Sequence, residues 1–164
     1  MTDRQRAMHI GRSAALKYVT IGLLIAQLIM MLVYYRQGLV DSFLWFSDFG
    51  YQINLVIAIA AIYFCAYILG GMAGISIIIK RRNYLWAGFL YGLMILIIST
   101  FLASLTGFFK EGIYDVGDYG YGSPFFDYVF KPLFWVTITG FMPVLIVGFR
   151  FGFSIYKKGK NCGK

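Results

Sequence analysis

The 164 residues predict a single all-α integral membrane domain of four transmembrane helices, arranged as an antiparallel up-down bundle. Hydrophobic residues make up 60% of the chain and charged residues 13%, whereas soluble domains average about 45–50% and about 25%. Four stretches with few or no charges come close to the roughly 20 residues that cross a bilayer, or exceed them. This composition excludes a disulfide-rich secreted scaffold, a disordered chain and a soluble α/β enzyme.

The first two predicted spans are residues 18–35 and 53–78. The basic residues 1–17 are interpreted as a flank that orients the first span, with a helical extension or contact with anionic headgroups as alternatives. Residues 36–48 carry apolar side chains largely on one helical face, which predicts a short helix on the outer membrane surface.

The last two predicted spans are residues 84–107 and 132–155. The short turn Lys80–Arg82 predicts that the second and third helices are antiparallel neighbours, and Asn83 is a predicted N-cap. Pro143 lies inside the fourth span and predicts a kink there, because proline cannot donate a backbone hydrogen bond.

The segment 110–131 is an outer acidic loop rich in Gly and Tyr. Glu111, Asp115 and Asp118 are candidate cation ligands, but a hard cation needs six or more oxygens in a defined geometry. The sequence therefore favours a solvated acidic cap over a cation site.

Lys and Arg are distributed unevenly between the two predicted sides of the membrane. The N-terminal segment, the second turn and the C-terminal end hold 12 of the 15 (4 + 3 + 5). Because cytoplasmic segments are enriched in Lys and Arg, this count predicts that both termini are cytoplasmic. We expect a multi-pass protein of a bacterial inner (cell) membrane.

Polar side chains inside the predicted spans are few, and no Asp, Glu, Lys or Arg is expected at a midplane. Gln27 and Asn54 are the candidate polar contacts. An amide in hydrocarbon is unfavourable without a hydrogen bond, so Gln27 is expected to face another helix rather than lipid. Contact with a transported solute is the alternative.

Small residues recur at four-residue spacing, which lets helix backbones approach closely in a membrane. Helix one also carries such a pair, Gly22 and Ala26. The stripes of the second and third helices are predicted to face each other across the short turn. The predicted packing residues are Ala66, Gly70, Gly74, Gly88, Gly92, Gly148 and Gly152.

No arrangement of residues in this sequence points to catalysis, and the single histidine, His9, is predicted on the cytoplasmic side, away from most acids. We expect no cofactor, no metal and no nucleic-acid partner. The sequence favours a non-catalytic subunit of a homo- or hetero-oligomeric membrane complex, in contact with lipids and with itself or another membrane protein. The alternatives are a small channel or carrier with a polar path at an oligomer axis and, third, a membrane enzyme acting on a lipid-linked substrate.

Overall fold

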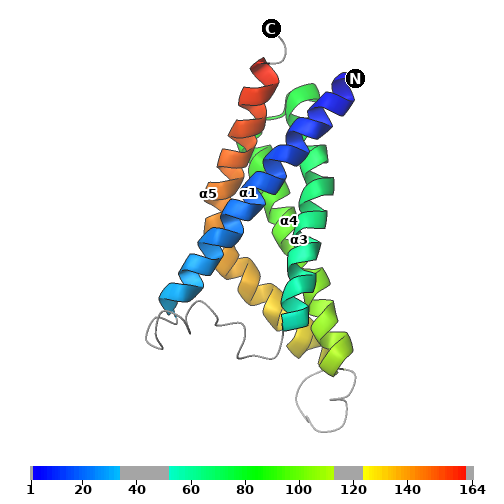
Figure 1. Ribbon diagram of the computed structural model, residues 1–164, viewed down its shortest axis with the longest axis vertical. Helices are drawn as coiled ribbons and strands as arrows, with labels where there is room; N and C mark the ends of the chain where they lie inside the picture. The colour runs from blue at the N-terminus through cyan, green and yellow to red at the C-terminus, as the bar shows by residue number, and fades with distance from the viewer. Residues whose placement is uncertain (1, 34–51, 113–123, 162–164) are drawn as a thin grey trace.

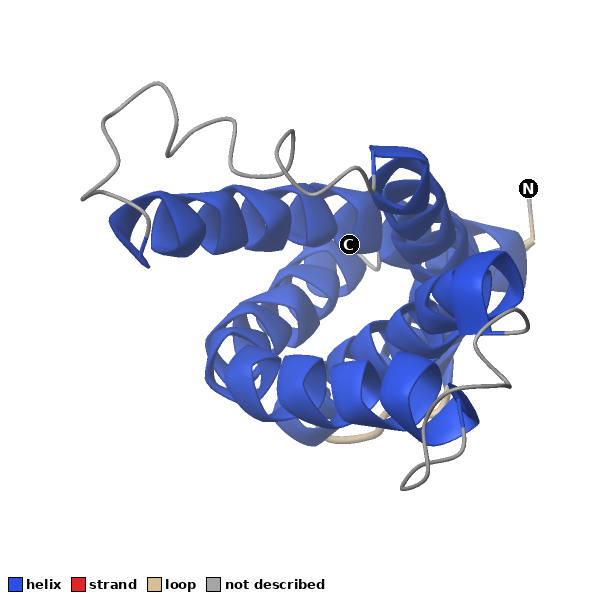
Figure 2. Cartoon of the chain, turned by 90° about the horizontal axis from the view of Figure 1, so that it is seen from below, coloured by secondary structure: helices blue, strands red, loops and turns tan. Residues whose placement is uncertain are grey.

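The computed structural model describes residues 2–33, 52–112 and 124–161, and these residues are almost entirely helical (Figures 1 and 2). Four of the described helices are long and apolar enough to cross a membrane, which supports a multi-pass membrane protein. The elements are α1 (Asp3–Val33), α3 (Gln52–Gly74), η2 (Ile75–Ile79), α4 (Tyr84–Gly107), η3 (Phe108–Gly112), η4 (Phe126–Phe130) and α5 (Lys131–Asn161).

Helix α1 begins at Asp3, much earlier than the predicted span at residue 18. The backbone N–H of Thr2 donates to the Gln5 side chain at 3.0 Å, and the Gln5 N–H donates to the Thr2 hydroxyl at 3.3 Å. This reciprocal pair is a capping box, which starts a helix by satisfying its first free N–H groups. The basic N-terminal residues are therefore part of the helix, and the interpretation of residues 1–17 as a plain flank is corrected.

The turn between η2 and α4 forms as predicted. The Asn83 side chain accepts a hydrogen bond from the Leu85 N–H at 2.9 Å, which confirms Asn83 as the N-cap of α4. Arg81 adopts a left-handed conformation with φ 49°. A single left-handed residue reverses the chain within a very short connection.

Pro143 lies inside α5, and the helix continues on both sides of it. Figure 1 shows that α5 changes direction in its orange middle part. Proline removes a helical hydrogen bond and its ring displaces the preceding turn, so a bend at this place is the expected consequence.

Helices α1 and α3 approach each other at backbone distance. A Cβ atom added to Gly11 would overlap the carbonyl oxygen of Gly70 and lie 2.8 Å from the Gly74 Cα. One added to Gly74 would overlap the Ala7 carbonyl oxygen, and Ala15 fills the space beside Gly70. The small residues of α3 therefore pack on a matching small-residue stripe in the N-terminal part of α1.

Helices α4 and α5 form a second close pair. A Cβ on Gly88 would overlap the Gly148 carbonyl oxygen and lie 2.7 Å from the Gly152 Cα. One on Gly152 would overlap the carbonyl oxygen of Tyr84. Gly92 lies further along the same contact, where its added Cβ would be 3.6 Å from the Gly148 Cα.

The structure corrects the prediction that the α3 and α4 stripes face each other. Gly70 and Gly74 face α1, and Gly88 faces α5. The short turn makes α3 and α4 neighbours, but it does not determine which face each helix turns toward the other. The small-residue face of α3 contacts the backbone of α1, and the small-residue face of α4 contacts the backbone of α5. Ala66, one turn before Gly70, is fully buried in the core.

The other end of α1 diverges from the bundle. Figures 1 and 2 both show its C-terminal end separated from the neighbouring ends of α3 and α4. Gly22 has no atom within 4 Å of an added Cβ. Leu24 and Leu32 are 61% and 76% exposed. The bundle is therefore tightly packed near the chain ends and open at the opposite end of α1.

The predicted surface segment 36–48 lies outside the described residues, as do residues 113–123 of the acidic loop. The described parts of that loop are helical: η3 continues to Gly112, and η4 leads directly into α5. Asp127 and Lys131 form an ion pair one helical turn apart. These turns lengthen the third and fourth helices beyond their predicted bounds.

Candidate functional site

A line of polar side chains lies along the contact between α1 and α3. The Arg12 guanidinium of α1 lies over the Tyr67 ring of α3, 4.1 Å from its centroid. Two turns further along α1, the Thr20 and Tyr63 hydroxyls form a hydrogen bond of 2.8 Å. We name these four residues the α1–α3 seam.

Helical periodicity explains why these side chains form a line. Arg12 and Thr20 are eight residues apart on α1, and Tyr63 and Tyr67 are four apart on α3. Residues four or eight apart lie on one helix face, and the two helices cross with these faces together. Gln27, seven residues after Thr20, lies on the same face of α1 and is half-buried.

Arg12 is held closely against α3. A Cβ on Gly71 would lie 3.2 Å from the Arg12 Nε, so the glycine leaves room for the arginine side chain. The Nε atom is buried and has no hydrogen-bond partner among the described residues. The Tyr67 ring supplies a cation–π contact, which attracts the charge but accepts no conventional hydrogen bond. The guanidinium is thus positioned while one of its donors is unsatisfied.

The position of Arg12 along the bundle follows from the chain on either side of it. Tyr67 precedes Lys80, in the basic turn, by 13 residues, which is about 20 Å of helix at 1.5 Å per residue. On α1, Lys17 follows Arg12 by five residues, and the uncharged part of the helix, Tyr18–Val33, begins after it. Arg12 therefore lies in the basic N-terminal part of α1, beside the apolar helix α3.

The early start of α1 carries Arg12 past the end of α3 and beside its apolar part. An ionisable side chain held against an apolar membrane helix is unfavourable without a partner, and such residues are candidates for functional sites.

The other predicted polar candidates do not join the seam. Asn54 precedes Tyr63 by nine residues, which places it on the opposite face of α3. Ser99 and Ser104 are buried in α4, and their hydroxyls donate to the carbonyl oxygens of Leu96 and Thr100 in the same helix. These serines therefore do not contribute to a shared polar path.

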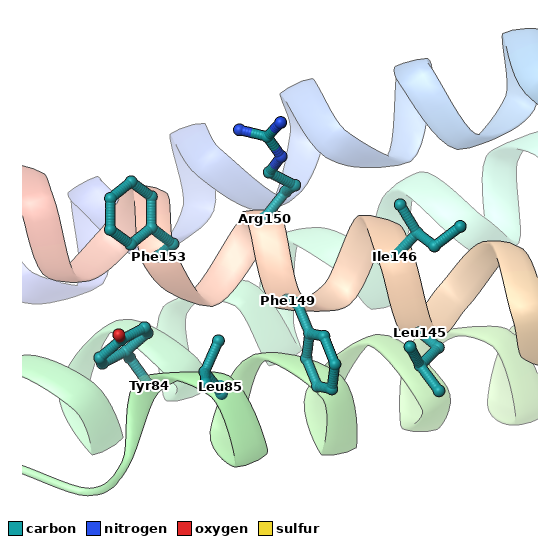
Figure 3. A pocket seen from close by; sticks show the side chains of 7 residues that line it. All are labelled: Tyr84, Leu85, Leu145, Ile146, Phe149, Arg150 and Phe153. Atoms are coloured by element: carbon teal, nitrogen blue, oxygen red, sulfur yellow. The ribbon is translucent and has the colours of Figure 1, made fainter.

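A second surface feature is an open groove of about 390 Å³ between α4 and α5. Figure 3 shows Leu145 and Phe149 pointing toward α4, whereas Arg150 points away on the other side of α5. Apart from Arg150 and the Tyr84 hydroxyl, the groove lining is apolar. It offers a surface for hydrocarbon and no nucleophile beside an acid or base.

Within the part of the chain that the structure describes, no three His, Cys, Asp or Glu side chains gather in a way that would hold a metal ion. The chain matches no protein-family model, no curated protein and no solved structure. Function must therefore be argued from the residues of the seam.

The sequence analysis found Gln27 but missed Arg12, Thr20, Tyr63 and Tyr67. Their signal is a spacing of eight residues on α1 and of four on α3. The signal is weak in the sequence, because a basic N-terminal segment need not be helical and tyrosines are common at membrane interfaces.

Proposed function

We propose that this protein is a non-catalytic subunit of an oligomeric membrane complex, and that the α1–α3 seam faces a partner. The observation that carries the proposal is Tyr67, which is 46% exposed beside Arg12 on the side of a membrane-spanning helix pair. Thr20 is exposed as well, but its hydroxyl is already bonded to the Leu16 carbonyl oxygen at 3.0 Å and to the Tyr63 hydroxyl. Lipid tails offer no hydrogen bond to Arg12 or to the Tyr67 hydroxyl, so a protein surface satisfies these two groups better.

The diverging end of α1 supports the same proposal. Gly22 and the exposed Ala26 are four residues apart, the spacing of the contacts at Gly70–Gly74 and Gly148–Gly152. Those two pairs contact the backbone of a second helix, whereas Gly22 has nothing within 4 Å. Glycine is unfavourable in a helix by about 1 kcal/mol relative to alanine, and close approach of a partner helix would offset that cost.

The proposed orientation places both termini in the cytoplasm of a bacterial inner membrane, with four antiparallel helices. Figure 1 shows both marked chain ends at the same end of the molecule. The basic turn Lys80–Arg82 belongs to that end, together with most Lys and Arg residues. Their enrichment there matches the positive-inside bias of membrane proteins.

A channel or carrier is the second candidate, favoured by one observation. The seam continues toward Gln27 on the same face of α1, so polar groups follow much of the length of this helix. Two or more copies with these faces together would line a polar path. The direct hydrogen bond between the Thr20 and Tyr63 hydroxyls is typical of a packing contact between helices rather than of a hydrated pore.

In-membrane photo-cross-linking tests the proposal. A photoreactive amino acid replaces Leu24, which is beside the seam and 61% exposed, or Leu90 of α4, which is 52% exposed and serves as the matched control. A subunit whose seam is covered gives a discrete protein adduct from position 24 and mainly lipid adducts from position 90. Lipid adducts alone at both positions, in native membranes, would contradict the proposal.

A further inference from the structure

We propose that the open groove between α4 and α5 binds one anionic phospholipid, with an acyl chain along its apolar walls and the phosphate at its basic end. This inference is separate from the proposed function, because the groove lies outside the α1–α3 seam. The observation that carries it is the change from apolar to basic residues along one face of α5, which borders the groove.

The walls of the groove suit a hydrocarbon chain. Leu145 and Phe149 point toward α4, whereas Ile146 and Phe153 border the opening on the other side of α5 (Figure 3). Ile146 is 65% exposed and Phe153 is 45% exposed, so the described residues leave the opening uncovered. The lining on α5, residues 145–153, extends about 12 Å along the helix at 1.5 Å per residue. An exposed apolar groove in a membrane-spanning helix pair is a surface for an acyl chain.

The border of the groove on α5 continues into a row of cations. Five residues follow one another at spacings of four, three, four and three positions: Ile146, Arg150, Phe153, Lys157 and Lys160. These spacings place them on one side of the helix, and α5 is helical over all of them. Arg150 is exposed and belongs to the lining, and the two lysines are exposed beyond it. A phosphate beside Phe153 would therefore have a cation on either side of it along the helix.

Both helices become basic at the same level of the bundle. On α4, the lining residues Tyr84 and Leu85 follow the basic turn Lys80–Arg82 within three residues. On α5, Tyr156 directly precedes Lys157, and the Tyr156 ring stacks on the Tyr84 ring with 4.8 Å between centroids. The groove thus ends between two basic segments. Basic pockets between membrane helices bind anionic headgroups, because Lys and Arg attract the phosphate.

Charge distinguishes this occupant from the alternatives. A second copy in the same orientation would bring its own basic turn and C-terminal lysines to this level, where like charges oppose each other. Among the described residues that line the groove, none is acidic. A zwitterionic lipid would fill the apolar walls but carries no net charge to attract the cations. An anionic phospholipid matches both the walls and the basic end.

Lipid titration of the purified full chain tests the headgroup. Dioleoyl phosphatidylglycerol is the probe and dioleoyl phosphatidylcholine is the control, and native mass spectrometry in mild detergent measures the affinity for the first bound lipid. Phosphatidylglycerol should bind at least about tenfold more tightly, because two or more cations attract its charge. Equal affinities for the two lipids would refute the proposal.

Two double variants separate the groove from diffuse attraction to a basic protein. Arg150→Gln/Lys157→Gln removes two exposed cations beside the groove, and Arg4→Gln/Arg6→Gln removes two exposed cations from α1. Diffuse attraction would weaken equally in both, since each loses the same charge. The groove variant should bind phosphatidylglycerol at least about tenfold more weakly than the parent, and the N-terminal variant no more than about threefold. A groove variant whose loss does not exceed that of the N-terminal variant would overturn the proposal.

A phosphatidylglycerol with a photoreactive group in its acyl chain tests the position of the tail. After irradiation of the parent chain, adducts should concentrate on the peptides that contain Leu85 and residues 145–153, and the groove variant should lose them. Because the peptides of one folded chain are compared, the first result does not depend on any variant. Adducts spread over the four long helices in proportion to their exposure would indicate ordinary lipid contact and contradict a defined site.

Discussion

Replacement of Gly74 by leucine should separate α1 from α3. An added Cβ would already overlap the Ala7 carbonyl oxygen and lie 3.0 Å from the Gly11 Cα. Both obstacles are backbone atoms of α1, which cannot turn aside as a flexible side chain does. The three further carbons of leucine enlarge the overlap, so the helices must move apart along their closest contact.

The magnitude follows from two opposing effects. Overpacking of a tight contact costs about 1–3 kcal/mol, while leucine is favoured over glycine in a helix by about 0.8 kcal/mol. Gly22→Leu isolates the second effect, because nothing lies within 4 Å of a Cβ at that position. The propensity gain is common to both variants and cancels, so their free energies of unfolding should differ by the overpacking cost, about 1–3 kcal/mol, with Gly74→Leu the less stable.

Thermal unfolding in mild detergent, followed by circular dichroism, measures this difference. For a chain of this size, about 2–4 °C of Tm accompany each kcal/mol, so Gly74→Leu should unfold at least about 2 °C below Gly22→Leu. Equal Tm values for these two variants would refute the backbone contact between α1 and α3.

Three further outcomes are expected. Cysteine at Ser13 should react with an impermeant reagent only from the cytoplasm and cysteine at Ser123 only from outside; external labelling at position 13 would reverse the proposed topology. Tyr63→Phe removes the hydrogen bond to Thr20 and should lower stability by about 0.6–1.7 kcal/mol, with an unchanged Tm counting against that bond. Gln27→Leu should weaken assembly without changing solute flux, whereas altered flux with intact assembly would favour the channel or carrier.

The helical membrane class was predictable because it follows from composition and from apolar stretches of sufficient length. The Asn83 cap was predictable for a local reason, since its side chain satisfies an N–H only two residues away. The bend in α5 near Pro143 is equally local, because it arises from one residue's covalent geometry.

The pairing of helices was not predictable from the same local rules. The Gly70–Gly74 stripe has the same four-residue spacing as several other small-residue stripes in the chain, and spacing alone does not say which stripe it meets. The contact also needs the basic N-terminal residues to be helical, a state that the capping box at Thr2 and Gln5 supports. In that helix, Gly11 lies opposite Gly74 and Arg12 lies beside Tyr67.

The mass of the particle that this chain forms in its own membrane tests the central claim most directly. The complex is extracted in mild detergent and measured by native mass spectrometry, with denaturation of the same sample to count the types of chain. We predict an assembly well above the 18.6 kDa of one chain, formed with further copies of this chain or with another membrane protein. A single species of 18.6 kDa with only lipid bound would contradict it.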